Sequence, residues 1–209
     1  MISRRAALIE LGLFLALVFS FIWVWARAFP QAATVVYLLG LGLTLTTHWI
    51  HRETPRELGV RIDNIGAAAK EAGLLALPIA GAFLILGWVN GNLSMAVLGG
   101  ERFLRVTGWG LLQQYLLQSF IHRRLTVLIG ASPARELAVG AIFAALHLPN
   151  PVLVPVTFLA GYVFAVLYRR HPNLLVLALC HAVGSTAVAF GFDPEDLRKM
   201  RVGPGYRMV

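Results

Sequence analysis

Seven long apolar runs, separated by short polar breaks, constrain this chain more than any other feature. The hydrocarbon core of a bilayer is roughly 30 Å thick, and a helix crosses it with about 20 apolar residues. A spanning helix also satisfies all its backbone hydrogen bonds internally. The pattern therefore predicts an all-α fold, a polytopic transmembrane helical bundle of about seven spans (six to eight). The runs cover about 6–26, 31–50, 67–88, 106–121, 135–148, 152–168 and 173–192.

The composition excludes the other broad classes of protein. Of the 209 residues, 58% are hydrophobic and only 13% are charged, which is not the composition of a soluble or disordered chain. Cys180 is the single cysteine, so it has no partner for an intrachain disulfide. There is no repeat, linker or low-complexity segment, and we expect one transmembrane domain over residues 1–209.

Two of the seven runs allow an alternative interpretation. The first follows Arg4 and Arg5 and ends near Ala26-Arg27-Ala28, which has the small-x-small pattern of a signal-peptidase site. Signal h-regions are usually about 7 to 15 residues long, so we expect a retained span, with a signal peptide as the alternative. The fifth run is short and is closed by Leu148-Pro149-Asn150-Pro151. A short buried or re-entrant helix is the alternative there.

The charge balance is basic, with 18 Lys and Arg against 10 Asp and Glu. In a membrane protein this excess indicates topology and contact with anionic lipids, and we expect no nucleic-acid partner. An N-terminus inside the cell leaves three basic residues in the outer loops and four in a tail outside. The loop 51–64 is then a solvated cytoplasmic loop. The inner segments hold eleven basic residues: Arg4, Arg5, Arg52, Arg56, Arg61, Lys70, Arg123, Arg124, Arg135, Arg169 and Arg170.

Polar side chains inside the apolar runs carry the functional information, because each is costly unless it faces protein or water. Gln114, Gln118 and His122 recur every four residues and line one helix face, which must point into the bundle. Phe143 to His147 ends the fifth run with a histidine, and His181 shares a face with Ser185. Taken singly, each cluster is also explained as interhelical hydrogen bonding. Three clusters on three neighbouring spans indicate a shared internal site.

The order and spacing of these clusters resemble the CPBP family, the CAAX-protease and bacteriocin-processing membrane proteins that include the Ras-converting prenyl endopeptidases. That family carries Glu-Glu-x-x-x-Arg, then Phe-x-x-x-His, then His-x-x-x-Asn. Here the second motif is intact from Phe143 to His147, and the third keeps His181 with Ser185 in place of Asn. The first motif aligns on Gln113, Gln114 and Gln118. The resemblance covers about 109–190, within a motif core of about 106–192.

The resemblance implies an intramembrane endopeptidase that acts on a lipid-anchored, prenylated or membrane-embedded peptide. A glutamate would activate water while histidines assist and hold the oxyanion. The implied catalytic positions are Gln113, Gln114, His147 and His181, and the implied substrate-binding positions are Gln118, Phe143 and Ser185. Glutamine cannot take a proton from water, so the family's general base is missing. The alternative function is a non-catalytic membrane scaffold or immunity-type protein that binds a peptide, lipid or partner in the same cavity.

The remaining ionisable residues offer few substitutes for that base. A histidine, His147 or His181, is the candidate that remains in the motifs. Glu136 lies roughly 16 Å along a helix from His147, too far for contact. Glu10 is expected at the headgroups or paired with Arg4 or Arg5.

Metal and cofactor sites are not expected. His147 and His181 provide two ligands where a catalytic zinc usually has three, so we expect no metal and no cofactor. His48 and His51 are expected to cap a helix or lie among headgroups, and Cys180 to be a buried, inert thiol. The localisation expected is the cytoplasmic membrane of a bacterium or archaeon.

Overall fold

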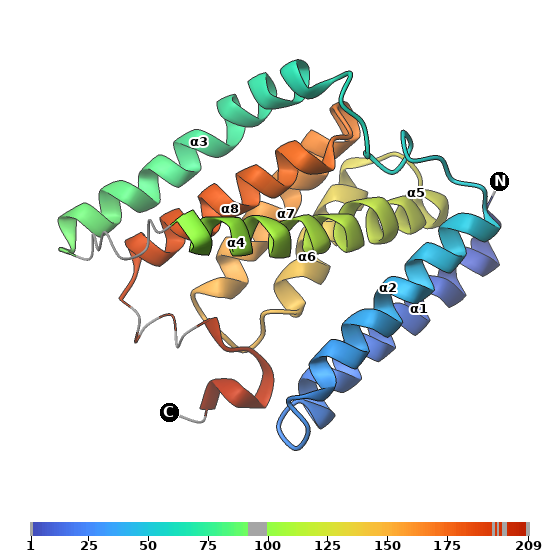
Figure 1. Ribbon diagram of the computed structural model, residues 1–209, viewed down its shortest axis with the longest axis horizontal. Helices are drawn as coiled ribbons and strands as arrows, with labels where there is room; N and C mark the ends of the chain where they lie inside the picture. Colours follow the sequence, from blue (N-terminus) through green and yellow to red (C-terminus); the bar gives the residue numbers. More distant parts are fainter. Residues whose placement is uncertain (1, 92–99, 194, 196, 198–199, 208–209) are drawn as a thin grey trace.

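The protein is a helical bundle, as the apolar runs predict. The computed structural model describes residues 2–91, 100–193, 195, 197 and 200–207, and this described part contains no strand. In two places an α-helix continues directly into a wider π-helical stretch, and we call each continuous set of helical elements a rod. One rod joins α1 to η1, and the other joins α4, η3 and α5. The elements are α1 (Arg4–Ser20), η1 (Phe21–Trp25), α2 (Ala32–Ile50), α3 (Ile65–Val89), α4 (Gly100–Gln114), η3 (Tyr115–His122), α5 (Arg123–Ile129), α6 (Pro133–Ala145), α7 (Leu153–Arg170), α8 (Leu174–Gly191) and η5 (Gly203–Arg207) (Figure 1).

Each of the seven predicted runs coincides with a helical rod, and successive rods run in opposite directions between two ends of the molecule. We call one end the basic end: it holds the first residues, the loop 51–64, the end of α5 and the turn between α7 and α8. The other is the far end. In the described chain five helices are long and apolar enough to cross a bilayer: Arg4–Trp25, Ala32–Ile50, Ile65–Val89, Leu153–Arg170 and Leu174–Gly191.

The two remaining rods depart from a simple span. α6 has 13 residues and rises about 20 Å, which is shorter than the roughly 30 Å core. It is therefore too short for a simple span, and the short buried or re-entrant helix stays a prediction. The rod from α4 to α5 is longer than the predicted 106–121, and its charged residues lie at its two ends. The charged residues at its ends and the glutamines in its buried middle, Gln113, Gln114 and Gln118, together lower its overall hydropathy.

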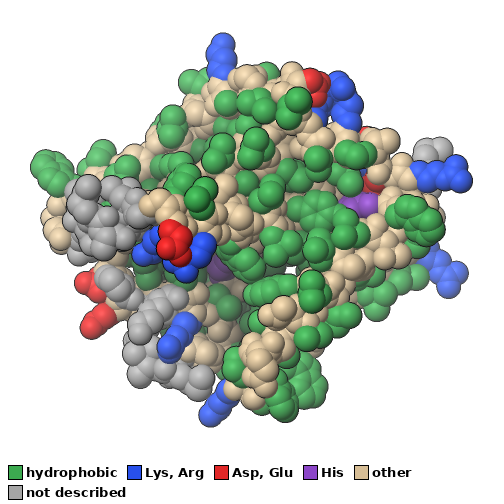
Figure 2. Space-filling view, in the orientation of Figure 1, with side chains coloured by type: hydrophobic (Ala, Val, Ile, Leu, Met, Phe, Trp, Pro, Cys, Tyr) green, Lys and Arg blue, Asp and Glu red, His purple; other side chains and the backbone are tan. Residues whose placement is uncertain are grey.

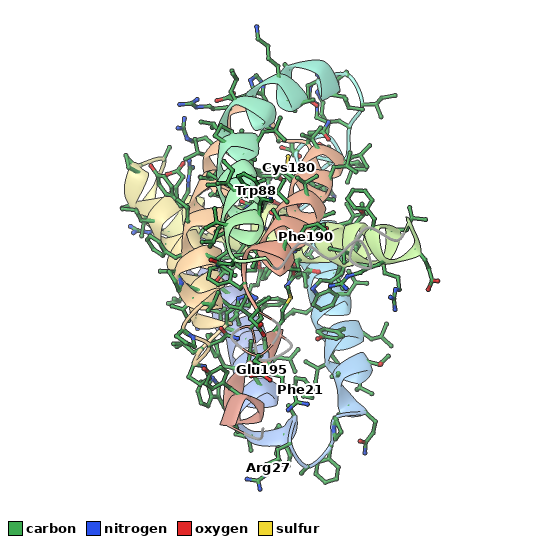
Figure 3. All side chains as sticks on the ribbon, turned by 90° about the vertical axis from the view of Figure 1, so that its left-hand side faces the viewer. Phe21, Arg27, Trp88, Cys180, Phe190 and Glu195 are labelled. Carbon is green, nitrogen blue, oxygen red and sulfur yellow. The ribbon has the colours of Figure 1, made fainter. Side chains whose placement is uncertain are left out.

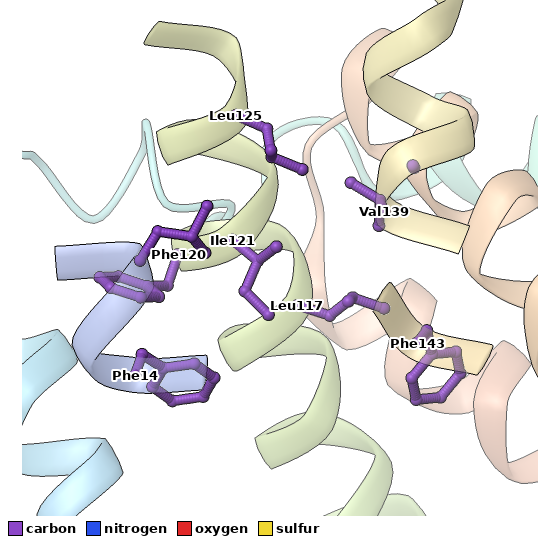
Figure 4. Packing of buried hydrophobic residues seen from close by; sticks show 9 residues of the cluster. Phe14, Leu117, Phe120, Ile121, Leu125, Val139 and Phe143 are labelled. Atoms are coloured by element: carbon purple, nitrogen blue, oxygen red, sulfur yellow. The ribbon is translucent and has the colours of Figure 1, made fainter. Parts of the chain in front are cut away.

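Close backbone contact joins α6 to α7. A Cβ added at Gly140 would lie 2.8 Å from the carbonyl oxygen of Phe158, and one at Gly161 would lie 3.0 Å from Gly140 Cα. Small residues at such a crossing let two membrane helices approach closely. The adjoining core is a cluster in which Phe14 of α1, Leu117 of η3 and Phe143 of α6 point into the same space (Figure 4).

The hairpin of α1 and α2 stands beside the other helices and is fastened to them at both ends (Figure 1). At the basic end, Arg124 of α5 donates to Glu10 at 2.7 Å and to Glu53 at 2.7 Å. At the far end, η5 contacts η1, near the labelled Phe21 (Figure 3). The hairpin is thus held by contacts with segments that lie far from it in the sequence.

Two expectations for the basic end were wrong, and a third holds only in part. Glu10 pairs with Arg124 and with His51 at 2.6 Å, not with Arg4 or Arg5. His48 is buried and donates from Nδ1 to Glu53 at 2.6 Å, so it neither caps a helix nor lies among headgroups. The loop 51–64 is mostly exposed, but Leu58 is buried and its carbonyl accepts from Ser119. Arg124, His51 and Ser119 each lie 41 or more positions from the residue they contact, so spacing does not reveal these contacts.

The C-terminal tail folds back across the far end. Asn150 donates from its side chain to the carbonyls of Leu197 and Arg201, and the amide of Gly203 donates to Leu148 at 2.7 Å. The tail therefore lies at the end of the molecule opposite the N-terminus (Figure 1). Of its basic residues, positions 198 and 199 lie outside the described residues.

Candidate active site

A cavity of about 560 Å³ lies between the α1–α2 hairpin and the helices α3, α4, α7 and α8, and its walls are mostly apolar. Figure 2 shows this face of the molecule covered by hydrophobic side chains, with charges mainly at its periphery and a histidine visible in a hollow. Five residues of the predicted site line the cavity: Gln113, Phe143, His147, His181 and Ser185. They come from three separate elements, so the fold brings the three motifs to one place.

His147 is placed by the end of α6. The helix stops at Ala145, and the His147 side chain turns back so that Nδ1 lies 2.7 Å from the carbonyl oxygen of Phe143. A carbonyl only accepts, so Nδ1 carries the proton of this hydrogen bond. The lone pair of the neutral ring is therefore on Nε2. The ring also packs edge-on against Phe143, with centroids 4.8 Å apart.

His181 is oriented by a chain of two amides. Gln118 donates from Nε2 to Oε1 of Gln114 at 3.3 Å, and Gln114 Nε2 lies 3.3 Å from Nδ1 of His181. With the amides oriented as they are in the structure, Gln114 donates and His181 Nδ1 accepts. The proton of the neutral ring is then on Nε2. At Nε2, therefore, His181 is a hydrogen-bond donor and His147 is a hydrogen-bond acceptor.

Gly110 allows His181 to lie close to α4. A Cβ at this position would be 3.1 Å from the His181 ring and 3.2 Å from the carbonyl oxygen of Ala178. Sequence reasoning missed this residue. The available signal was a glycine one helical turn before Gln114, in a helix interior where glycine costs about 1 kcal/mol relative to alanine.

Comparison of the sequence with known families supplies the remaining evidence. Residues 103–187 match the family model described as type II CAAX prenyl endopeptidase Rce1-like. This match supports membership of the CPBP family. The matched stretch contains all three motif clusters, from Gln113 to Ser185. No curated protein and no solved structure matches the chain.

The predicted site residues occupy two layers of the structure. Gln113 is in the cavity wall, whereas Gln114 and Gln118 are fully buried behind His181. Phe143 lies between the histidines, with its ring centroid 6.4 Å from that of His181. The motif positions are therefore divided between groups that face a ligand and groups that hold His181.

The chemical groups of the cavity wall limit the reactions that the site can support. Among the described residues that line it there is no carboxylate, and Arg102 is the charged one. Cys180 is in the wall and half-buried, in contrast to the buried thiol expected. In the described part of the chain no three His, Cys, Asp or Glu side chains gather to hold a metal. The expected absence of a metal and a cofactor stays a prediction.

Proposed function

We propose that the protein is an intramembrane endopeptidase in which a histidine replaces the glutamate that the family uses as base. One observation carries the proposal: His147 and His181 line the same cavity with opposite hydrogen-bonding roles. His147 presents a lone pair on Nε2 and His181 presents an N–H. Hydrolysis of an amide needs both, a group that accepts a proton from water and a group that donates to the developing oxyanion.

The proposed reaction uses the residues in named roles. Nε2 of His147 takes a proton from water as the water oxygen attacks the peptide carbonyl. His181 Nε2–H donates to the oxyanion, and Gln113 orients the water or the carbonyl with its amide. Protonated His147 then gives the proton to the leaving amine. Gln114 and Gln118 act as positioning residues, because their amides hold His181 in the donating tautomer.

The substrate class follows from the walls of the cavity. The walls are apolar over most of their area, and several of the helices that form them are long and apolar enough to cross a bilayer. Such a space favours an apolar group, and we propose a lipid-anchored, prenylated or membrane-embedded peptide. The match to the prenyl endopeptidase family model supports a prenylated peptide in particular.

Cleavage by the purified protein tests the proposal. The protein in lipid nanodiscs is offered quenched-fluorescence peptides that carry a farnesylated, an acylated or no cysteine. We expect slow cleavage of a lipidated peptide, and a loss of roughly 10²- to 10⁴-fold in His147→Ala. His171→Ala is the matched control, because His171 is a half-exposed histidine at the basic end. Full activity in His147→Ala would rule out the base that we assign.

Restoring the family's charges gives a second test. Gln113 lines the cavity, and Gln118 contacts Gln114, so Gln113→Glu, Gln114→Glu and Gln118→Arg together place a carboxylate at the wall with an ion pair behind it. We expect this triple variant to cleave faster than the wild type. Gln114→Glu alone should unfold more easily, by roughly 2.5 to 3.5 kcal/mol, because the buried charge has no partner. A folded triple variant that is no faster than a cleaving wild type would show that a carboxylate at position 113 does not act as a base in this cavity.

A binding role is the second candidate function. The absence of a carboxylate among the described lining residues favours it, because such a cavity can hold a ligand without reacting with it. In that case neither the wild type nor a well-folded triple variant cleaves any peptide. Saturable binding of the lipidated peptide, lost in a variant that fills the cavity such as Ala80→Phe, would then identify the scaffold.

A further inference from the structure

A second cavity, of about 320 Å³, lies at the basic end and is separate from the candidate active site. Its wall is formed by residues from η3, α5, α6 and α7 together with the loop 51–64. We infer that this basic pocket binds the phosphate of an anionic phospholipid headgroup. The polar side chains that carry the inference are His122, Arg123, Thr126, Arg135, Tyr168 and Arg169.

His122 is the strongest indication of a ligand. Its side chain is only 4% exposed, and neither ring nitrogen has a hydrogen-bond partner among the described residues. An imidazole always carries at least one N–H, so a buried donor is left without an acceptor. Buried donors in native proteins are almost always paired with protein, water or a ligand. The ring packs edge-on against Tyr168, with centroids 5.6 Å apart.

Two arginines beside His122 share one carboxylate. Arg135 binds Glu136 at 2.6 Å, and Arg169 binds the same oxygen at 2.8 Å. Arg135 also donates to the Thr126 hydroxyl at 3.1 Å, while its Nε is buried without a partner in the described chain. Both arginines use Oε1 of Glu136, so Arg135 Nε and Glu136 Oε2 are both left buried without a partner among the described residues. Arg135 Nε is thus a second buried donor near His122 that lacks an acceptor.

The other carboxylates of the pocket are already occupied. Glu53 accepts from Arg123, Arg124 and His48. Glu57 accepts from the backbone amide and the hydroxyl of Thr54, at 2.7 and 2.8 Å. Neither acid accepts a hydrogen bond from His122 or from Nε of Arg135. A phosphate can, because its oxygens accept from several guanidinium and imidazole N–H groups at once.

The position of the pocket indicates where the phosphate comes from. Its floor is buried at His122, Arg135 and Tyr168, whereas the Arg169 side chain at its rim is 45% exposed. The rim lies where α7 ends and α6 begins, at the level at which helices that cross a bilayer reach the headgroups. A phospholipid offers its phosphate at this level, while free phosphate shares the chemistry and comes from solution.

Thermal unfolding of delipidated protein in an uncharged detergent tests the inference. Short-chain phosphatidylglycerol, short-chain phosphatidylcholine and inorganic phosphate are titrated separately at constant ionic strength. We expect a saturable rise of the unfolding midpoint with phosphatidylglycerol and none with phosphatidylcholine. An equal rise with inorganic phosphate alone would support the site and assign free phosphate as its ligand. No saturable rise with either phosphate source would overturn the inference.

Variants place the effect at this pocket. His122→Phe keeps a ring against Tyr168 and removes both nitrogens, so the protein should fold while its apparent affinity falls roughly tenfold or more. Arg169→Gln, at the half-exposed rim, should weaken binding in the same direction. Arg170→Gln is the matched control, because Arg170 is adjacent but binds Glu71 outside the pocket. Equal responses in all three variants and the wild type would overturn the inference.

Discussion

His147 and His181 have the same side chain and opposite tautomers because the neighbour of Nδ1 differs. A carbonyl, which can only accept, faces Nδ1 of His147, and an amide N–H faces Nδ1 of His181. The motif spacing predicted that the two residues share a site but left either one as the base. The tautomer depends on an amide 67 positions away and on a side chain that turns back at a helix end. Neither contact is visible in a spacing of residues.

Substitution of Gly110 tests the placement of His181. In Gly110→Ala the new Cβ meets the His181 ring at 3.1 Å and a backbone carbonyl at 3.2 Å, so the ring must move. We expect weaker ligand binding or slower cleavage and a loss of roughly 1 to 3 kcal/mol in the free energy of unfolding. Gly108→Ala is the control on the same helix, since nothing lies within 4 Å of its Cβ, and it should be stabilised. Normal function in Gly110→Ala would contradict the placement.

Among the elements, the helices were predictable and their lateral connections were not. Run length and hydropathy predicted each rod, and Gln114, Gln118 and His122 are buried as their spacing requires. Yet His122 belongs to the basic pocket, because eight residues after Gln114 is about 12 Å along a helix axis. No sequence pattern indicates the π-helical hydrogen bonding of η3. The same holds for the pairing of Glu10 with Arg124, which lies 114 positions away.

The ion pairs of Arg124 are predicted to hold the α1–α2 hairpin at the basic end. Arg124 is fully buried, binds Glu10 and Glu53, and lies 4.9 Å from the centre of the Phe120 ring. Removing one partner of a buried ion pair leaves an uncompensated charge, so Arg124→Met should cost roughly 3 to 5 kcal/mol. Chemical denaturation in detergent measures this loss. Asp63→Asn is the control, because Asp63 forms an exposed ion pair with Arg56 in the loop 51–64, which also contains Glu53. This variant should leave the unfolding transition unchanged. An equal loss of stability in both variants would contradict the assignment.

Glu53 makes the same contact sensitive to acid. Burial raises its pKa, but hydrogen bonds from His48 and Arg124 and the charge of Arg123 outweigh this and lower the pKa to about 2 from an ordinary 4.5. A lowered folded pKa stabilises the fold above the unfolded value and loses that contribution as pH falls. The unfolding midpoint should therefore drop between about pH 4.5 and 2. A Glu53→Gln variant with an equally steep drop would show that another group is responsible.

For the whole molecule, the described helices alternate between two ends, and the basic residues gather at one of them. Eleven of the 18 Lys and Arg lie at the basic end, and they are the same eleven that the sequence predicts for the inner side of the membrane. This much follows from the sequence, because run lengths and charges are read along the chain. The cavity does not, since its walls come from five or more elements whose packing depends on contacts such as those of Gly140 and Gly161.

The charge distribution predicts that the basic end faces the cytoplasm. A reporter fused after Arg170, or inserted in the loop 51–64, should be active in the cytoplasm. A reporter fused at the C-terminal tail should be active on the other side, because the tail lies at the far end. A tail and an Arg170 fusion found on the same side would contradict the alternation of the rods.

The tautomers of the two histidines provide the most direct test of the proposed chemistry. Solid-state ¹⁵N spectra of histidine-labelled protein in lipid bilayers distinguish a protonated from an unprotonated ring nitrogen, and the variants His147→Ala and His181→Ala assign the signals. We predict a proton on Nδ1 of His147 and on Nε2 of His181, each in a neutral ring. The same tautomer at both positions would contradict the division into one base and one oxyanion donor.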